Sequence, residues 1–203
     1  MANEQRDNSG ILFVNKPKYP NQAALLVASE ILGYLRPVST RIEIAGSLRR
    51  GNELVGDVEI VFVPILGTKQ NHESLLPEPI LVNLADETIA TLIANGILAK
   101  RLNKNGRESF GEKNKLMTYV ASGIPVDLFA TNLEAWWNYL VCRTGGAETN
   151  VRICMAAKHR GLKWHPYGSG FTDLQTGIRL EAHSEREVFA IAGLKFLEPW
   201  ERH

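Results

Sequence analysis

Two neighbouring stretches of the sequence decide the fold, AGSLRRG at residues 45–51 and GDVEIVFV at residues 56–63. The first combines a Gly-Ser turn with two arginines. The second has the nearly continuous apolar character of a buried β-strand, with carboxylates at positions i and i+2. Because residues i and i+2 of a strand point to the same face, we expect Asp57 and Glu59 to project side by side.

Two carboxylates side by side repel each other unless a cation lies between them. Mg²⁺ binds carboxylate oxygens together with substrate phosphates, and two such ions can bracket the reacting oxygens of an in-line phosphoryl displacement. The backbone amides of Gly46 and Ser47 and the guanidinium of Arg50 are suited to holding the phosphates. The combination predicts a site for nucleotidyl transfer. The alternative is that these acids and arginines are ordinary exposed residues, as a carboxylate pair alone would indicate.

At these residues the chain resembles the nucleotidyltransferase superfamily, and more narrowly the family X DNA polymerases of the polymerase beta type. The pattern of that family is Gly-Ser-x-x-Arg, a short spacer, Gly-Asp-x-Asp on the next strand, and a third Asp on a later strand. The third carboxylate falls here on Asp127, within IPVDLF at residues 124–129. The second acid is Glu59 instead of Asp, which lengthens that side chain by one methylene. The resemblance implies that Asp57, Glu59 and Asp127 are catalytic and hold two Mg²⁺ ions, with Mn²⁺ as an alternative.

The second half of the chain resembles the C-terminal subdomain of the same family. The similarity rests on RTGG at 143–146, KHRGL at 158–162, SEREVF at 184–189 and LEPWER at 197–202. At the other end, KYP at 18–20 resembles a segment whose basic residue binds the triphosphate. The resemblance implies that the following residues contact the incoming nucleotide: Lys18, Gly46, Ser47, Arg50, Gly56, Thr144, Gly145 and Asn150.

The nucleotide pocket matches the family pattern only in part. Cys142-Arg143 stands where the family has a Tyr-Phe pair before the Thr-Gly turn. Ala147 replaces an Asp that stacks on the base, and Cys154 replaces an Arg that tests the nascent base pair. The catalytic motif is therefore specific, whereas the pocket motifs are incomplete.

Composition is that of an ordinary globular protein, with 203 residues, 44% of them hydrophobic and 22% charged. No apolar run is long enough to span a membrane, and the polar N-terminus lacks the apolar core of a signal peptide. The two cysteines, Cys142 and Cys154, form neither a metal-binding pattern nor a disulfide framework. We therefore expect a cytoplasmic protein with no membrane partner.

Basic residues are concentrated in two segments, although the net charge of the chain is only +1. Lys100–Lys115 carries six basic residues against two acids, and Val141–Gly170 carries five against one. Basic surface beside a cluster of acids is typical of proteins that bind a nucleic-acid backbone. The alternative is that the two segments are solvated faces.

The spacing of apolar residues and the positions of Pro and Gly predict the main helices and strands. Asn21–Leu35 has helical spacing and is preceded by Pro20. We expect Gly67–Pro79 to be a polar loop, and Ser122-Gly123 to turn the chain into the strand of Asp127, which would then lie beside the strand of Asp57. The remaining elements expected are helices at 84–95 and 148–160, a helix with a capping box at 184–187, and strands at 41–45, 58–64, 97–102 and 115–121.

The fold class expected is α/β (α+β), with a nucleotidyltransferase palm of mixed β-sheet and helices at residues 1–135 and a small α/β thumb-like subdomain at 136–203. The adjacent Trp136 and Trp137 diverge on a helix, so we expect them to pack between the two domains. In relation to larger family members, the chain resembles a minimal palm-plus-thumb form without lyase and helix-hairpin-helix domains, as in some viruses and phages.

The function that the resemblance implies is metal-dependent addition of dNMP to a DNA 3′-hydroxyl with release of pyrophosphate, in DNA repair or gap filling. The implied partners are DNA, as primer-template or gapped duplex, and a nucleoside triphosphate. We expect a monomer. The alternatives are a nucleotidyltransferase that acts on RNA or on a small-molecule acceptor, and a catalytically idle DNA-binding protein of the same fold.

Overall fold

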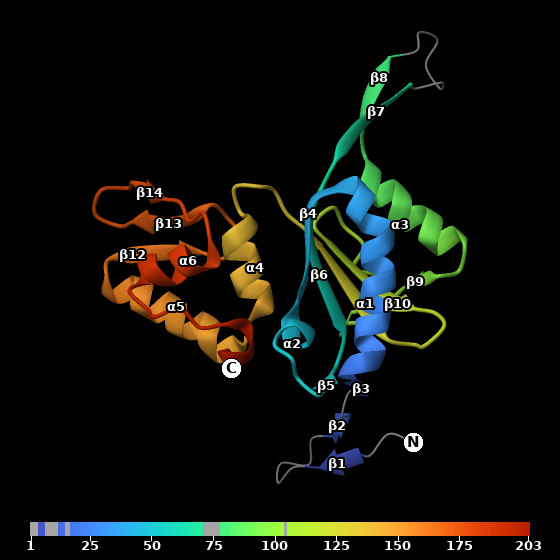
Figure 1. The fold of residues 1–203 in the computed structure, drawn as a ribbon, viewed down its shortest axis with the longest axis horizontal. Coiled ribbons are helices and arrows are strands. Elements are labelled where there is room, and N and C mark those ends of the chain that lie inside the picture. The colour runs from blue at the N-terminus through green and yellow to red at the C-terminus, as the bar shows by residue number, and fades with distance from the viewer. Residues whose placement is uncertain (1–3, 7–11, 15–16, 71–77, 104) are drawn as a thin grey trace.

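The computed structural model describes residues 4–6, 12–14, 17–70, 78–103 and 105–203. Its centre is a five-stranded mixed sheet, and Figure 1 shows helices on both sides of it. In spatial order the strands of this sheet are β4 (Ser39–Ala45), β6 (Val58–Pro64), β11 (Pro125–Ala130), β10 (Asn114–Tyr119) and β9 (Leu98–Lys100).

In the described part of the chain the α-helices are α1 (Asn21–Leu35), α2 (Gly46–Arg49), α3 (Leu84–Ala94), α4 (Trp136–Thr144), α5 (Ala147–His159) and α6 (Glu185–Ala192). The small strands are β1 (Glu4–Arg6) with β2 (Leu12–Val14), β3 (Tyr19–Pro20) with β5 (Leu54–Val55), β7 (Leu66–Gln70) with β8 (Pro79–Asn83), and β12 (Leu162–His165), β13 (Gly170–Asp173) and β14 (Arg179–Leu180). Two 3₁₀ turns lie at Arg36–Val38 and Pro199–Glu201.

Strand pairing in the central sheet brings distant parts of the sequence into one row. β6 and β11 run parallel, with Glu59 opposite Asp127, whereas the other pairs are antiparallel. Ala45 lies opposite Glu59 on one side, and Leu116 lies opposite Asp127 on the other. Directly paired residues point to the same face of a sheet. One face therefore presents Ala45, Glu59, Asp127 and Leu116 in order across four strands.

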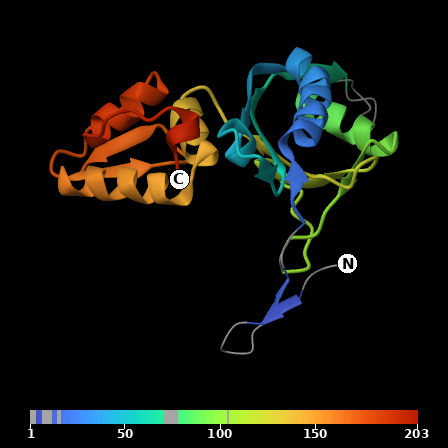
Figure 2. The ribbon, with the colours of Figure 1, turned by 60° about the horizontal axis from the view of Figure 1, so that its bottom comes forward.

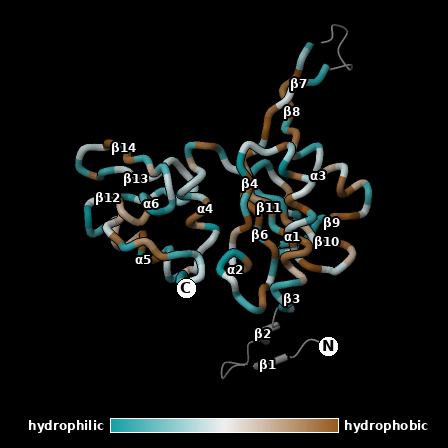
Figure 3. Tube along the Cα trace, in the orientation of Figure 1, coloured by the Kyte–Doolittle hydropathy of each residue, from teal (hydrophilic) through white to brown (hydrophobic). Residues whose placement is uncertain are grey.

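The opposite face of the sheet is covered by α1 and α3, as Figure 2 shows from another direction. Alternate residues of β6, namely Val58, Ile60 and Phe62, point into this layer and are fully buried. They pack against the buried stripe of α1, which includes Ala28 and Ile31. In Figure 3 the turn α2 is hydrophilic, whereas the strands behind it are largely hydrophobic.

Helix α4 crosses the face that carries the acids. Trp136, Tyr139 and Leu140 pack on Val61 and Phe129 of the sheet. Val141 of the same helix belongs to a second core with α5, α6 and β12–β14. Trp137 lies half-buried between the two cores, which agrees with the expected packing between domains. Because α4 contributes to both cores, the boundary at residues 135 and 136 stays a prediction.

One segment expected to be an irregular polar loop, residues 67–79, contains strand residues at 67–70 and at 79, while its residues 71–77 lie outside the described part of the chain. β7 and β8 pair antiparallel, from Leu66 with Asn83 to Gln70 with Pro79. The alternation of Gly and Lys with other residues here gives no apolar face that would predict a strand. Cross-strand hydrogen bonds and the ion pair of Lys69 with Glu87 of α3 support the extended form.

The expected capping box of α6 is also altered. The Ser184 hydroxyl accepts a hydrogen bond from the Glu187 amide at 3.1 Å, but the Glu187 carboxylate accepts from the His183 amide and not from that of Ser184.

Replacement of a residue in the layer under α1 tests this packing. We expect Ile60→Ala to lower the free energy of unfolding by about 2–5 kcal/mol, because removal of the fully buried side chain leaves a cavity. The control is Leu26→Ala on the outer side of α1, where the side chain is 74% exposed and a change of at most about 0.5 kcal/mol is expected. Urea unfolding measures both, and equal effects would contradict the assignment of the core.

Candidate active site

The turn α2 begins directly after β4 and places Gly46 against the acid row. Gly46 has a φ of +63°, a conformation that favours glycine. A Cβ atom built on it would overlap Oε2 of Glu59. Glycine is therefore required at this position on two grounds, backbone conformation and the close approach of the Glu59 carboxylate.

The three predicted carboxylates lie at one end of the sheet face that α4 covers in part. Asp57 directly precedes β6, Glu59 is the second residue of that strand, and Asp127 is paired with Glu59 across the parallel strands. All three are partly buried. The structure thus brings together the acids that the sequence predicts, and Asp57 and Glu59 are not ordinary exposed acids.

Burial and mutual repulsion disfavour the charged form of this cluster. Burial raises the pKa of Glu59 to about 8, and the neighbouring charge of Asp57 adds to this effect. Burial also raises the pKa of Asp127, although the Arg101 guanidinium opposes that shift. A cation at the cluster would reverse both shifts.

Two arginines that sequence reasoning did not single out as site residues compensate these acids. Arg101 forms an ion pair with Oδ1 of Asp127. The Arg143 guanidinium lies 3.6 Å from the centroid of the Phe129 ring, and its charge lowers the pKa of Glu59 and of Asp127. Nε of Arg143 is buried without a hydrogen-bond partner. The family pattern gave no signal for either residue, because Arg101 lies outside the motifs and Arg143 departs from them.

The residues expected to hold the nucleotide approach the cluster from both halves of the chain. Arg50 donates a hydrogen bond to the Thr144 carbonyl at 2.5 Å, and a Cβ at Gly145 would lie 3.2 Å from Nη1 of Arg50. Lys18 is exposed, and the pairing of Tyr19 with Val55 places it next to Gly56.

Asn150 and Ser47 complete the expected set. Asn150 donates from Nδ2 to the Cys142 carbonyl at 2.9 Å, and its Oδ1 is buried without a partner. Ser47 lies in α2 and is half-buried. Asn150 is therefore tied to α4 and Ser47 belongs to α2, and contact of either residue with a nucleotide stays a prediction.

Arg49 joins the turn α2 to the C-terminal half. Its two terminal nitrogens donate to both oxygens of Glu185 at 2.8 and 2.9 Å, and Nη1 also donates to the Thr144 hydroxyl at 2.7 Å. Glu185 accepts a further bond from the fully buried Arg202 at 3.0 Å. The Arg49 side chain is only 18% exposed, so it is not half of an ordinary exposed pair.

The residue types fit a divalent metal site. Carboxylate oxygens are the ligands that Mg²⁺ prefers, and Glu59 and Asp127 lie side by side with Asp57 close by. Within the described part of the chain, however, no three His, Cys, Asp or Glu side chains are grouped so that they could hold an ion as they stand. One oxygen of Asp127 is engaged by the ion pair with Arg101.

A cavity of about 590 Å³ lies against helix α4, at the C-terminal ends of β6 and β11 and the start of β10, whereas Asp57 and Glu59 lie at the other end of β6. Arg143, Tyr139 and Tyr167 line one side of it. None of the three acids lines this cavity, so the chemistry is assigned from the acids and not from the cavity.

Two comparisons with known proteins bear on the fold of the chain. Residues 139–203 match the family described as DNA polymerase beta thumb. The fold of the chain is similar to that of Leishmania infantum polymerase beta in a ternary P/T complex, with a TM-score of 0.69, 18% sequence identity, and coverage of 92% of this chain and 77% of that chain. The C-terminal third is therefore similar to a polymerase beta thumb, and the chain has a polymerase beta-like fold. No curated protein matches the sequence.

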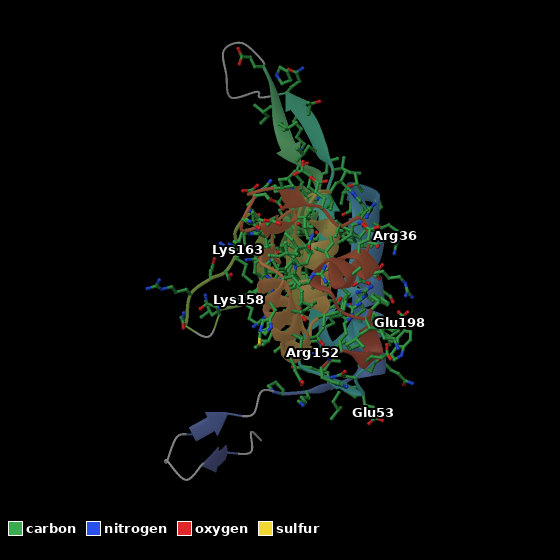
Figure 4. All side chains as sticks on the ribbon, turned by 90° about the vertical axis from the view of Figure 1, so that its left-hand side faces the viewer. Arg36, Glu53, Arg152, Lys158, Lys163 and Glu198 are labelled. Carbon is green, nitrogen blue, oxygen red and sulfur yellow. The ribbon has the colours of Figure 1, made fainter. Side chains whose placement is uncertain are left out.

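Residues 139–203, which match the thumb family, contain one of the two basic segments. Lys158, at the end of α5, and Lys163 of β12 are both exposed. Figure 4 shows them on one side of the molecule, away from Arg36 and Glu198. Among the described residues, no helix is long and apolar enough to cross a membrane.

The pKa of Glu59 leads to a pH-dependent stability. Its pKa is about 8 in the folded protein against an ordinary value of 4.5, so the folded protein binds this proton more tightly than the unfolded chain does. The stability that the protonated group contributes is present below about pH 4.5 and is lost as the pH rises through about 8. In metal-free buffer we expect Glu59→Gln, which mimics the protonated form, to be more stable than the wild type near pH 8.5 and similar to it near pH 4.5.

Urea unfolding at the two pH values measures this difference. Glu53→Gln is the control, because Glu53 is exposed and lies outside the cluster. An equal difference between Glu59→Gln and the wild type at both pH values would contradict the buried position of the Glu59 carboxylate.

Proposed function

We propose that this chain, with its polymerase beta-like fold, is a metal-dependent nucleotidyltransferase that adds dNMP to a DNA 3′-hydroxyl and releases pyrophosphate. The observation that carries the proposal is the pairing of Glu59 with Asp127 across parallel strands, with Asp57 beside them and Gly46 against Glu59. The similarity to a polymerase beta in a ternary P/T complex supports DNA as the partner.

Asp57, Glu59 and Asp127 would hold two Mg²⁺ ions, or Mn²⁺ in their place. Bound at this cluster, such ions supply charge neutralisation for a phosphoryl displacement. Asp127 would orient the attacking 3′-hydroxyl and accept its proton, because it is the acid in the paired row that lies farther from α2.

The triphosphate would bind at the other side of the row. The amides of Gly46 and Ser47 begin α2, and Arg50 and Lys18 supply positive charge there. Thr144, Gly145, Gly56 and Asn150 surround the same region, and the buried, unpaired Oδ1 of Asn150 is an acceptor that a nucleotide could satisfy. Positioning and charge stabilisation then account for most of the rate.

DNA repair by gap filling is the role that we propose for this activity, by a protein that acts as a monomer. The basic segments at 100–115 and 141–170 would contact the DNA backbone.

Replacement of Asp127 tests the catalytic assignment. We expect Asp127→Ala to abolish nucleotide incorporation, because the reaction loses both a metal ligand and the group that orients the hydroxyl. Primer extension on gapped, blunt and single-stranded DNA with Mg²⁺ measures the activity, and circular dichroism checks that the variant folds. Glu134→Ala is a matched control, because it removes an exposed acid only seven residues away in the sequence.

Near-normal turnover by Asp127→Ala would show that the third ligand is wrongly assigned. Activity on RNA or a small molecule but not on DNA would favour a different acceptor. DNA binding without any transfer, with all substrates and metals, would favour an idle DNA-binding protein.

Neutralisation of the thumb lysines tests the DNA-binding surface. We expect Lys158→Ala with Lys163→Ala to weaken DNA binding by a similar factor for all sequences, because the phosphates that lysines bind carry no sequence information. The slope of log affinity against log salt should fall by about 0.9 for each phosphate that the variant no longer neutralises. Lys195→Ala, an exposed lysine outside both basic segments, is the control. An unchanged slope would mean that this surface faces away from the DNA.

A further inference from the structure

Arg101 lies on the same sheet face as the acids. It directly follows β9, and its amide donates to the Leu116 carbonyl at 2.9 Å. Leu116 is in turn paired with Asp127. The row across the sheet therefore runs from Ala45 through Glu59 and Asp127 to Leu116 and Arg101.

The Arg101 side chain is fixed at two points. Nε donates to the Met117 carbonyl at 3.3 Å, and Nη2 forms the ion pair with Oδ1 of Asp127. The two side chains are 27% and 13% exposed, so the pair is shielded from solvent without being sealed from it. Charge-assisted bonds of this kind are stronger than neutral ones.

This ion pair opposes the proposed use of Asp127. A guanidinium on Oδ1 places a positive charge beside the position that a metal ion would take, and it also occupies lone pairs of that oxygen. A divalent ion that binds Asp127 must therefore overcome the repulsion from the Arg101 guanidinium. Removal of Arg101 without a replacement partner for Asp127 leaves a partly buried carboxylate that only another cation can neutralise.

Arg101 also stands near the start of the basic segment at 100–115. Lys100, Arg107 and Lys113 of this segment are exposed. A guanidinium can exchange a carboxylate for a phosphate, since its planar fork pairs with either.

The position of Arg101 in the row shows whether it would meet a phosphate of the nucleotide or one of the DNA strand. The turn α2, where the triphosphate is proposed to bind, follows Ala45 at one end of the row. Arg101 lies at the opposite end, beyond Asp127. A phosphate near Arg101 is therefore on the side of the 3′-hydroxyl and not on the side of the nucleotide.

We propose that Arg101 exchanges its ion pair with Asp127 for a backbone phosphate of the DNA strand that carries the 3′-hydroxyl, so that bound DNA frees Asp127 for a metal ion. Arg101 is thus a positioning residue that couples metal affinity to DNA occupancy. The inference rests on the proposed function, because it takes DNA as the acceptor and Asp127 as a metal ligand. By linkage, metal must strengthen DNA binding by the same factor as DNA strengthens metal binding.

Mn²⁺ binding without nucleotide tests the coupling, with free Mn²⁺ measured by electron paramagnetic resonance. For the wild type we expect gapped DNA to raise the Mn²⁺ affinity by about 10-fold, within the range usual for coupled sites. Arg101→Met should bind Mn²⁺ more tightly than the wild type without DNA, and DNA should add little to it. DNA alone supplies the background of Mn²⁺ bound to phosphates.

Two further variants separate the role of Arg101 from general effects of charge. Lys195→Met removes an exposed positive charge that lies outside both basic segments and should keep the wild-type coupling. Arg101→Lys keeps the charge and should keep part of the coupling. Arg101→Met should also lower the salt slope of DNA binding by about 0.9, the value for one neutralised phosphate. Urea unfolding confirms that each variant is folded.

The outcomes decide between the two proposals. Unchanged Mn²⁺ affinity of Arg101→Met without DNA, or coupling equal to that of the wild type, would overturn the exchange by Arg101. A deoxynucleoside triphosphate could instead raise the Mn²⁺ affinity of the wild type in place of DNA, and Arg101→Met could remove that increase. This result would assign Arg101 to the nucleotide and would also overturn its exchange to a DNA phosphate. A wild type that binds neither Mn²⁺ nor DNA would instead overturn the proposed function.

Discussion

The site depends on the parallel pairing of β6 with β11, which brings Glu59 and Asp127 into register. The two strands are separated by more than 60 positions in the sequence, and β7, β8, α3, β9 and β10 lie between them along the chain. A shift of one residue in this register would turn Asp127 to the face of α1 and α3, where the side chains of β6 and β11 are buried and apolar. The apolar residues that alternate with the acids, such as Ile60 and Leu128, hold the register because they are fully or almost fully buried on that other face.

Compensation of the acids follows from this pairing. Burial, together with repulsion from neighbouring carboxylates, raises the pKa of Glu59 and of Asp127, and guanidinium groups lie around these acids. Arg101 directly follows the edge strand β9, Arg50 directly follows α2, and Arg143 comes from α4. Arg50 and Arg143 also contact the C-terminal half or belong to it, so the charge balance of the sheet depends on residues from both halves of the chain.

Reasoning from the sequence found those features of the fold and the site that local patterns and motif spacing determine. The helix at 21–35 was predicted with its bounds, because its apolar residues recur at helical spacing between Pro20 and Pro37. The acids could be placed because the strand of Asp127 is preceded by a clear turn at Ser122-Gly123. The contact of Arg101 with Asp127 could not be found in this way, since it depends on the register of β9 against β10 and joins side chains that are 26 positions apart in the sequence.

Long-range partners were missed for a related reason. Arg49 and Glu185 are 136 positions apart, and nothing near either residue indicates the other. The hairpin of β7 and β8 was missed because Gly67 and Lys69 interrupt any apolar alternation, so only the cross-strand bonds define it. The capping of α6 was half right, since the Ser184 contact is local whereas the choice of amide by Glu187 depends on the path of the preceding chain.

The position of α4 has a consequence for folding. Its tryptophan and tyrosine side chains complete the core on the sheet, while Val141 completes the core of the C-terminal half. Neither core is closed without this one helix, so the loss of α4 from either side exposes apolar surface on both. The two halves should consequently melt together as a single cooperative unit, although each has a sheet of its own.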